Sequence, residues 1–216
     1  MKKKIKKILN KKGKEPITCL TAYSKNVAEI VDKYCDIILV GDSVGMVLYG
    51  MKNTKNVKLE TMILHARAVK EVAKKSLVVI DMPNKTYSSK SIAFKNAKKL
   101  FKTTKCDAVK LEGGKNKVKI INYLVSKGIP VMGHIGLLPQ SSNNFRLKGK
   151  NFLQRKKILD DAVAVSNAGV FAIVVECVVE NLANEITKKV SVPTIGIGAS
   201  KYCDGQILVS DDMLGL

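Results

Sequence analysis

The feature that most constrains this chain is a regular alternation of short apolar runs with amphipathic stretches, from residue 18 to residue 209. Eight runs rich in Val, Ile and Leu are bounded by Gly, Pro, Asp or Lys, which is typical of parallel strands buried on both faces. Parallel strands need long crossovers rather than tight hairpins. The predicted strands are residues 18–21, 37–40, 77–80, 108–111, 131–134, 172–175, 194–197 and 207–209.

Between the runs, apolar residues recur at the i, i+3, i+4 spacing of helices that cover a sheet. The predicted helices are residues 24–34, 59–73, 91–101, 118–125, 151–168 and 182–190. Strict strand–helix alternation predicts right-handed crossovers, and eight such strands favour a closed (β/α)₈ TIM barrel over an open sheet. No G-x-G-x-x-G motif follows the first strand, which argues against a dinucleotide-binding sheet. We expect residues 1–216 to form one α/β barrel domain, with residues 1–16 as a basic segment preceding strand one.

Charge and composition bear on the partners of the chain. Lys and Arg number 38 against 18 Asp and Glu, a net charge of +20, but the cations are nearly all Lys and are spread over every predicted helix. With 5% aromatic residues and no Trp, this pattern favours solvated helix faces over specific nucleic-acid binding, and a basic RNA-binding protein is the non-enzyme alternative. No apolar run is long enough to cross a membrane, and the N-terminus lacks the apolar stretch of a signal peptide. We therefore expect a cytoplasmic protein without membrane partners.

Ionisable and polar residues follow most of the predicted strands. In a (β/α)₈ barrel the catalytic groups come from the C-terminal ends of several strands. Any one Asp could simply cap the next helix, and a lone His is often structural, but so many charged groups at one barrel end are hard to explain by capping. The residues in question are Asp42, Ser43, Asp81, Lys110, Glu112, His134 and Glu176.

The composition of this predicted mouth favours a divalent cation and chemistry next to a carbonyl. Asp42, Asp81 and Glu112 offer hard oxygen ligands, which suit Mg²⁺ or another divalent cation. Such an ion, chelated by an α-keto acid, stabilises the enolate that forms when a proton leaves the neighbouring carbon. Glu176 is then the candidate base, and Lys110 the candidate partner for the substrate carboxylate or the oxyanion.

Six ordered blocks carry a resemblance to a known enzyme family. They are LVGDSVGMVLYG, VVIDMP, DAVKLEGG, PVMGHIGLLPQS, FAIVVECV and PTIGIGAS with the following CDGQILV. In order and spacing they resemble the ketopantoate hydroxymethyltransferases from Ile17 onward. The resemblance implies a barrel of the phosphoenolpyruvate/pyruvate type. It also implies hydroxymethyl transfer from 5,10-methylenetetrahydrofolate to 3-methyl-2-oxobutanoate through a Mg²⁺-stabilised enolate, giving 2-dehydropantoate for pantothenate and coenzyme A.

The same resemblance implies a role for each position and a state of assembly. The residues implied to hold the keto acid are Asp42, Ser43, Asp81 and Lys110. Those implied to bind Mg²⁺ are Asp42, Asp81 and Glu112. Glu176 would be the catalytic proton acceptor, with His134 as a supporting residue. A decamer-like homo-oligomer is expected.

The chain also departs from the family pattern. It ends just after predicted strand eight, so we expect the barrel to lack its final C-terminal helical segment. Residues 54–58, Asn84 and the short loop 141–150 differ near the predicted mouth and bear on folate binding. The alternatives are a Mg²⁺-dependent lyase or mutase of the same barrel type, an aldolase with Lys110 as Schiff base, and an inactive truncated homologue.

Overall fold

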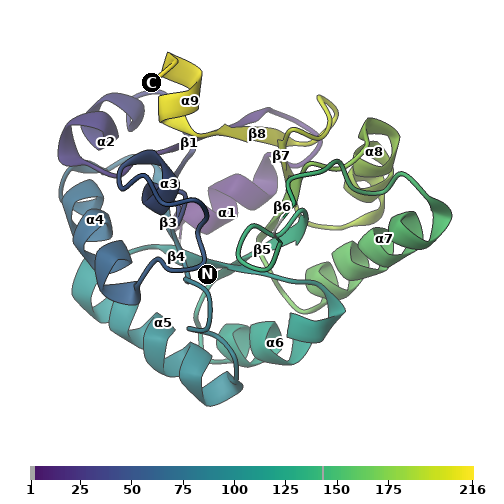
Figure 1. Cartoon of the computed structure of the whole chain (residues 1–216), viewed down its shortest axis with the longest axis horizontal. Helices are drawn as coiled ribbons and strands as arrows, with labels where there is room; N and C mark the ends of the chain where they lie inside the picture. Colours follow the sequence, from purple (N-terminus) through teal and green to yellow (C-terminus); the bar gives the residue numbers. More distant parts are fainter. Residues whose placement is uncertain (1–2, 143) are drawn as a thin grey trace.

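The computed structural model describes residues 3–142 and 144–216, and within these residues eight parallel strands form one closed barrel in sequence order (Figure 1). Strand β1 pairs with both β2 and β8, which closes the ring. The predicted barrel is confirmed, and each predicted strand overlaps an observed one, with bounds that differ by up to two residues. The strands are β1 (Ile17–Thr21), β2 (Ile37–Val40), β3 (Leu77–Asp81), β4 (Ala108–Glu112), β5 (Val131–Gly136), β6 (Ala172–Glu176), β7 (Thr194–Ile197) and β8 (Gly205–Leu208).

The predicted helices form the outer layer around the strands (Figure 1). Three begin at a residue whose side chain accepts the backbone N–H three positions later: Ser24, Ser89 and Asn151. Such caps satisfy an amide that the first helical turn leaves unpaired. The helices are α2 (Lys25–Val31), α4 (Leu59–Val72), α5 (Lys90–Thr104), α6 (Val118–Ser126), α7 (Phe152–Asn167) and α8 (Glu180–Lys189).

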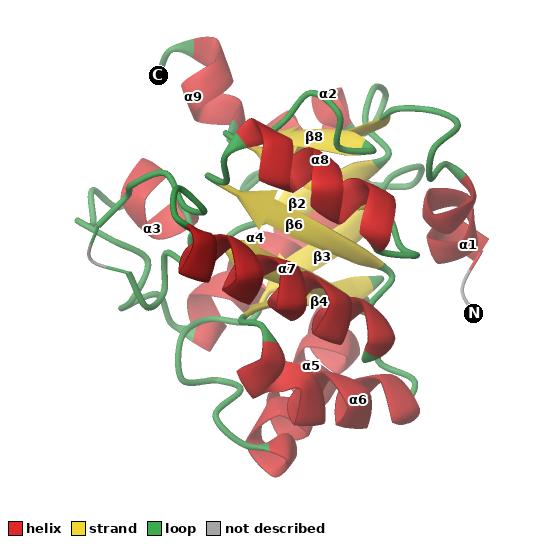
Figure 2. Cartoon of the chain, turned by 90° about the vertical axis from the view of Figure 1, so that its right-hand side faces the viewer, coloured by secondary structure: helices red, strands yellow, loops and turns green. Residues whose placement is uncertain are grey.

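A helix that was not predicted closes the N-terminal end of the barrel. Helix α1 (Lys3–Asn10) lies within the basic segment 1–16, and its Ile5 and Ile8 are buried in the same apolar cluster as Ile17 and Leu77. Figure 2 shows α1 at one end of the strands and helices α3 (Val44–Val47) and α9 (Ser210–Leu214) at the other. The mouth of the barrel therefore lies at the α3 and α9 end. Helices α3 and α9 and the short 3₁₀ helix η1 (Lys115–Lys117) were not predicted from the sequence either.

The last strand differs from the expectation of burial on both faces. Gln206 and Leu208, which alternate with buried residues along β8, are exposed. The chain turns at the barrel rim into the five-residue helix α9, whose Ser210 donates hydrogen bonds to the hydroxyl and carbonyl oxygens of Thr21. These bonds tie the end of β8 to the end of β1, so the rim is joined at the point of closure. The outer side chains of β8 face solvent.

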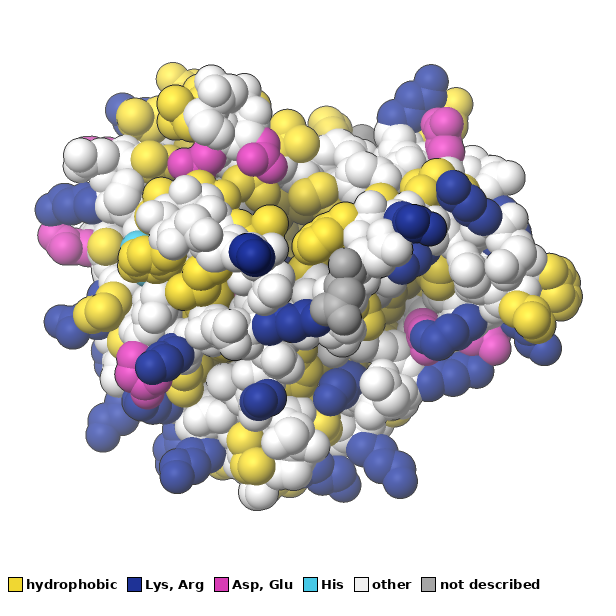
Figure 3. Space-filling view, in the orientation of Figure 1, with side chains coloured by type: hydrophobic (Ala, Val, Ile, Leu, Met, Phe, Trp, Pro, Cys, Tyr) yellow, Lys and Arg dark blue, Asp and Glu magenta, His cyan; other side chains and the backbone are white. Residues whose placement is uncertain are grey.

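The charged surface agrees with the pattern seen in the sequence. Lys and Arg side chains are scattered around the periphery of the face shown in Figure 3 and do not gather into one patch. No helix in the described part of the chain is both long enough and apolar enough to cross a membrane.

Candidate functional site

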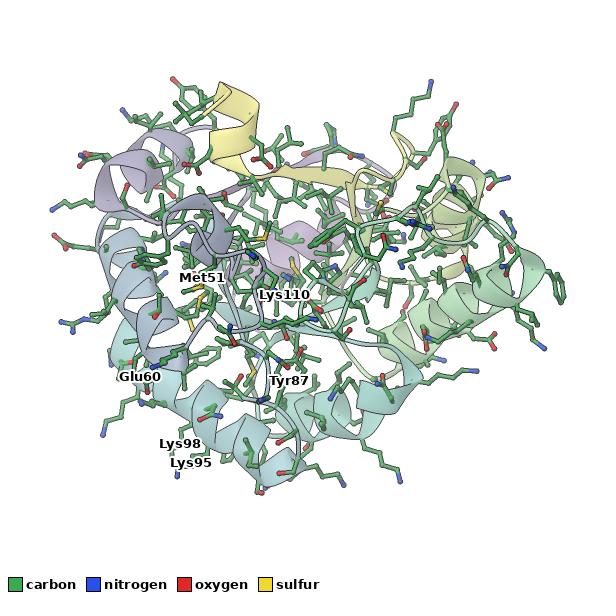
Figure 4. All side chains as sticks on the ribbon, in the orientation of Figure 1. Met51, Glu60, Tyr87, Lys95, Lys98 and Lys110 are labelled. Atoms are coloured by element: carbon green, nitrogen blue, oxygen red, sulfur yellow. The ribbon has the colours of Figure 1, made fainter. Side chains whose placement is uncertain are left out.

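A cavity of about 530 Å³ opens at the C-terminal end of the barrel. The structure brings every predicted site residue into the lining of this one cavity, although the role of each stays a prediction. Figure 4 shows Lys110 in the middle of the ring of strands, with Tyr87 on the side of helix α5. The predicted residues in the lining are Asp42, Ser43, Asp81, Lys110, Glu112, His134 and Glu176.

Lys110 is the buried cation of the cavity. Its Nζ lies 3.0 Å from Oδ1 of Asp81 and 3.3 Å from Nδ1 of His134. Burial by itself lowers the pKa of Lys110, but the neighbouring carboxylates, Asp81 foremost, outweigh burial and raise the pKa above its usual value. The ammonium group therefore stays charged, which makes an aldolase-type Schiff base at this position chemically unfavourable.

The carboxylates of the cavity carry more negative charge than Lys110 can balance. Burial, followed by repulsion from Asp81, raises the pKa of Asp42 to about 7. Burial also raises the pKa of Glu112 to about 9, since the attraction of Lys110 only partly offsets burial and the repulsion of Asp42 and Asp81. Carboxyl groups held in this way bind protons readily, and a divalent cation placed among them would displace those protons.

The oxygen and nitrogen donors of the cavity bear on the divalent cation that the resemblance implies. Among the described residues, three buried side-chain atoms make no well-aligned hydrogen bond, and all three residues line this cavity. They are Thr54 Oγ1, Asp81 Oδ1, which is ion-paired with Lys110, and His134 Nε2, which is in close contact with Glu176. Across all the described residues, no three His, Cys, Asp or Glu side chains are grouped closely enough to hold an ion unaided. Mg²⁺ usually binds through one or two carboxylates and completes its shell with water and substrate oxygens. The donors present therefore fit Mg²⁺.

His134 and Glu176 lie next to each other on neighbouring strands. Nε2 of His134 is 3.0 Å from Oε2 of Glu176, a close contact whose alignment falls short of a hydrogen bond. Burial, reinforced by the charge of Lys110, lowers the pKa of His134, so its imidazole is neutral near pH 7. Glu176 is the more accessible of the two, at the edge of the cavity, where a base can reach a substrate carbon.

Gly136 allows the close approach that places Glu176. The backbone of Gly136 has φ +91°, and a Cβ atom added there would lie 2.3 Å from the carbonyl oxygen of Glu176. That carbonyl accepts a hydrogen bond of 2.8 Å from the amide of Leu137. A side chain at residue 136 would separate the ends of β5 and β6, because both the conformation and the space admit only glycine.

Ser43 is held by a residue that the sequence analysis missed. The hydroxyls of Tyr23 and Ser43 lie 2.7 Å apart, and burial raises the pKa of Tyr23 to about 12, so the phenol stays protonated. Tyr87 and Gln140 were also missed, although Gln140 lies in the block PVMGHIGLLPQS that supports the resemblance. No local pattern marks Tyr23 or Tyr87, because each acts through a tertiary contact, Tyr23 with the cavity residue Ser43 and Tyr87 with Gln140.

The segments that depart from the family pattern lie close to this site. Thr54 and Phe145 line the cavity, and Asn84 lines a smaller adjoining cavity that also touches Glu112. Residue 143 of the loop 141–150 lies outside the described residues. The expectation that these segments adjoin the mouth is confirmed, and their effect on folate binding stays a prediction.

The whole chain is similar in sequence to one enzyme family. The family model described as ketopantoate hydroxymethyltransferase matches residues 2–216. The 3-methyl-2-oxobutanoate hydroxymethyltransferase of Pelagibacter ubique is 56% identical over 216 residues, which cover all of this chain and 84% of the relative. The enzyme of the same name from Phenylobacterium zucineum is 53% identical over 97% of this chain and 78% of its own length.

Solved structures with the same architecture are much more distant in sequence. A phosphonopyruvate hydrolase in complex with oxalate and Mg²⁺ superposes with a TM-score of 0.74 at 11% identity, covering 98% of this chain and 82% of that one. A 2,3-dimethylmalate lyase, described as a member of the PEP mutase/isocitrate lyase superfamily, superposes with a TM-score of 0.71 at 12% identity over 98% and 78%. At such low identity these matches show the fold alone, and they agree with the expected (β/α)₈ barrel.

Proposed function

This chain belongs to the ketopantoate hydroxymethyltransferase family, and from that premise we propose that its barrel mouth binds 3-methyl-2-oxobutanoate, removes the proton from C3 and joins a one-carbon unit to that carbon. Membership confirms the expected activity class, a hydroxymethyltransferase on the route to pantothenate. The alternative of a lyase or mutase holds only as a relation of fold.

The proposal rests on one arrangement: a base and a cation lie on opposite sides of the imidazole ring of His134. Lys110 and Glu176 both contact His134, Lys110 at Nδ1 and Glu176 at Nε2. The Lys110 ammonium attracts the substrate carboxylate or the oxygen on which charge develops. Glu176 then takes the C3 proton, and the bonding pair moves toward the keto oxygen. The neutral His134 orients Glu176 without adding a competing charge.

The residues that would hold Mg²⁺ are Asp42, Asp81 and Glu112, and Ser43 would join Asp42, Asp81 and Lys110 in holding the keto acid. When bound, the ion supplies Lewis-acid stabilisation of negative charge on the keto oxygen. The complex of a solved barrel of this fold with oxalate and Mg²⁺ supports this choice, because oxalate presents paired oxygens as an α-keto acid does.

We assign the one-carbon unit to 5,10-methylenetetrahydrofolate on the strength of the family. The C3–H bond breaks with the proton going to Glu176, and a C3–carbon bond forms to the methylene group. Both bonds from that methylene carbon to the folate nitrogens break, and water supplies the new hydroxyl oxygen. Tetrahydrofolate leaves with one proton on each of these nitrogens, one from water and one from C3 through Glu176. Met46, Val47 and Phe145 give the cavity an apolar rim on which a flat ring system can pack.

A homo-oligomer and a cytoplasmic location belong to the same proposal. Phe152 and Leu153 at the start of α7 are each 76% exposed, and assembly would cover such side chains. Light scattering of the purified chain tests the assembled state. A protein that stays monomeric over the working concentration range would contradict the proposed homo-oligomer.

The proposed chemistry is tested by NMR of the protein with 3-methyl-2-oxobutanoate in D₂O, with and without Mg²⁺. Loss of the C3 proton signal only when Mg²⁺ is present supports the enolisation step, and folate is not needed for this readout. A folded sample that exchanges nothing in the presence of Mg²⁺ would overturn the proposed function.

A further inference from the structure

Each carboxylate proposed to hold the cation has one oxygen fixed by an N–H group of the protein. Oδ2 of Asp42 accepts from Nε2 of Gln140 at 2.7 Å, and Oε2 of Glu112 accepts from the backbone N of Gln140 at 3.1 Å. Oδ2 of Asp81 accepts from the backbone N of Asp42 at 3.1 Å. One residue, Gln140, therefore holds carboxylates from two strands that are not neighbours in the barrel.

The side-chain amide of Gln140 can point in only one direction. Its Oε1 accepts a hydrogen bond from the hydroxyl of Tyr87, and its Nε2 also donates to the carbonyl oxygen of Met82 at 3.0 Å. A flipped amide would set Oε1 against Asp42 and against a carbonyl oxygen, and would leave the Tyr87 hydroxyl facing an NH₂ group. Gln140 and Tyr87 are both buried, which favours the orientation that satisfies every donor and acceptor within the protein.

Tyr87 also contacts the backbone of Glu112, whose carboxylate Gln140 holds. Its hydroxyl oxygen accepts from the backbone N of Glu112 at 3.4 Å while its proton goes to Gln140. Burial, followed by the charge of Glu112, raises the pKa of Tyr87 well above its usual value, so the phenol keeps that proton. Figure 4 shows Tyr87 on the α5 side of Lys110.

We propose that Gln140, oriented by Tyr87, is the positioning residue that sets Asp42 and Glu112 for a divalent cation. With one oxygen of each carboxylate fixed by Gln140, the other oxygen is left for the ion. The inference rests on the proposed function, because it assumes the cation at this site. Gln140 and the cavity residue Phe145 both lie in the β5–α7 connection. The proposal therefore couples the position of this connection to binding of the cation.

The expected loss of metal affinity follows from the role of residues that hydrogen-bond to metal ligands. Removing a hydrogen bond that orients a metal ligand typically lowers metal affinity by about 10–100-fold. A residue that only packed the loop would change stability and leave the affinity of the folded protein unchanged. Metal affinity, measured without substrate, therefore separates the two roles.

The experiment is a titration of the full chain with Mn²⁺ alone, with the free ion followed by electron paramagnetic resonance. Gln140→Met keeps the length of the side chain and removes its amide, and we expect about 10–100-fold weaker binding. Gln154→Met is the matched control. Gln154 Oε1 accepts from the backbone N of Gly149 in the same β5–α7 connection and touches no cavity carboxylate, so its variant should bind as the wild type does.

Tyr87→Phe supplies a second, milder variant in case Gln140→Met folds poorly. We expect weaker Mn²⁺ binding in Tyr87→Phe, and little further loss when it is added to Gln140→Met, because Tyr87 acts largely through Gln140. Wild-type affinity in folded Gln140→Met or in Tyr87→Phe overturns the inference and leaves the proposed function standing. A wild-type protein that binds no Mn²⁺ overturns the metal role in the proposed function, and this inference with it.

Discussion

Nε2 of His134 lies 3.0 Å from Oε2 of Glu176, on adjacent strands at the mouth of the barrel. The other ring nitrogen lies 3.3 Å from Nζ of Lys110, so one buried imidazole spans the distance between the candidate base and the candidate cation. Because the pKa of His134 is lowered by burial, the ring is neutral and carries one proton, which it can present to only one neighbour at a time. Lys110 has no lone pair to offer, and Nε2–H therefore faces Glu176.

Glu176→Gln should abolish exchange of the C3 proton while leaving metal binding largely intact. General-base catalysis by a positioned side chain typically contributes about 10²–10⁴-fold, so the loss in rate should fall in that range. The measurement is NMR of 3-methyl-2-oxobutanoate in D₂O with Mg²⁺, alongside a Mn²⁺ titration. Glu180→Gln, at an exposed position four residues later, serves as the control and should exchange normally. Full exchange in Glu176→Gln would remove Glu176 from the role of base.

The metal-free protein should lose stability as the pH rises from about 4 to 9. The pKa of Asp42 is raised to about 7 and that of Glu112 to about 9, so between pH 4 and 9 the folded state binds more protons than the unfolded state. The free energy of unfolding then falls with pH in that window. Urea unfolding at a series of pH values measures this slope.

Asp42→Asn is the control for the pH effect, because it removes one of the two titrating groups and should flatten the slope. Mg²⁺ should also flatten it, since binding of the ion drives the same protons off. A slope unchanged by Asp42→Asn would contradict the assignment to these carboxylates.

Gly136→Ala should lower both activity and stability, because it displaces the backbone at the ends of β5 and β6. The added Cβ would lie 2.3 Å from the carbonyl oxygen of Glu176, so β5 and β6 must move apart and Glu176 must shift. A shift of that kind costs about 1–3 kcal/mol of stability and also misplaces the base. Urea unfolding and the exchange assay measure the two losses.

Gly128→Ala is a close control for Gly136→Ala. Gly128 also has a positive φ, +76°, but nothing lies within 4 Å of a Cβ added there. It therefore reports backbone strain alone, on the order of 1 kcal/mol, with exchange preserved. Equal loss of exchange in the two variants would show that close approach to Glu176 is not what Gly136 provides.

Tyr23→Phe should weaken substrate binding more than it slows the chemistry. Its hydroxyl lies 2.7 Å from that of Ser43, and losing one hydrogen bond of about 1 kcal/mol corresponds to a rise of about fivefold in KM with kcat little changed. Steady-state kinetics with 3-methyl-2-oxobutanoate measures both constants. Tyr34→Phe, at a residue 75% exposed, should behave as the wild type. A fall in kcat alone would indicate that Tyr23 acts on the reacting atoms rather than through Ser43.

Much of the architecture could be predicted from local pattern. Strands such as 77–80 and 172–175 are apolar at every position, and the stretches between strands repeat every three to four residues, so parallel strands with helical crossovers were the consistent solution. Because the C-terminal ends of parallel strands meet at one end of a barrel, Asp42, Asp81 and Glu176 could be brought together without knowing any distance. The sequence by itself therefore determined the barrel and the residues of its mouth.

Only the tertiary structure decided how those residues are held. Gln140 touches Asp42, 98 positions away, and Glu112, 28 positions away, and Tyr23 reaches Ser43 from the end of another strand. Helix α1 was not predicted because its sequence is rich in Lys. The burial of its Ile5 and Ile8 depends on the open end of the barrel, which the local sequence does not record. Periodicity records which face of an element is apolar, whereas hydrogen bonds between loops depend on where the closed barrel places them.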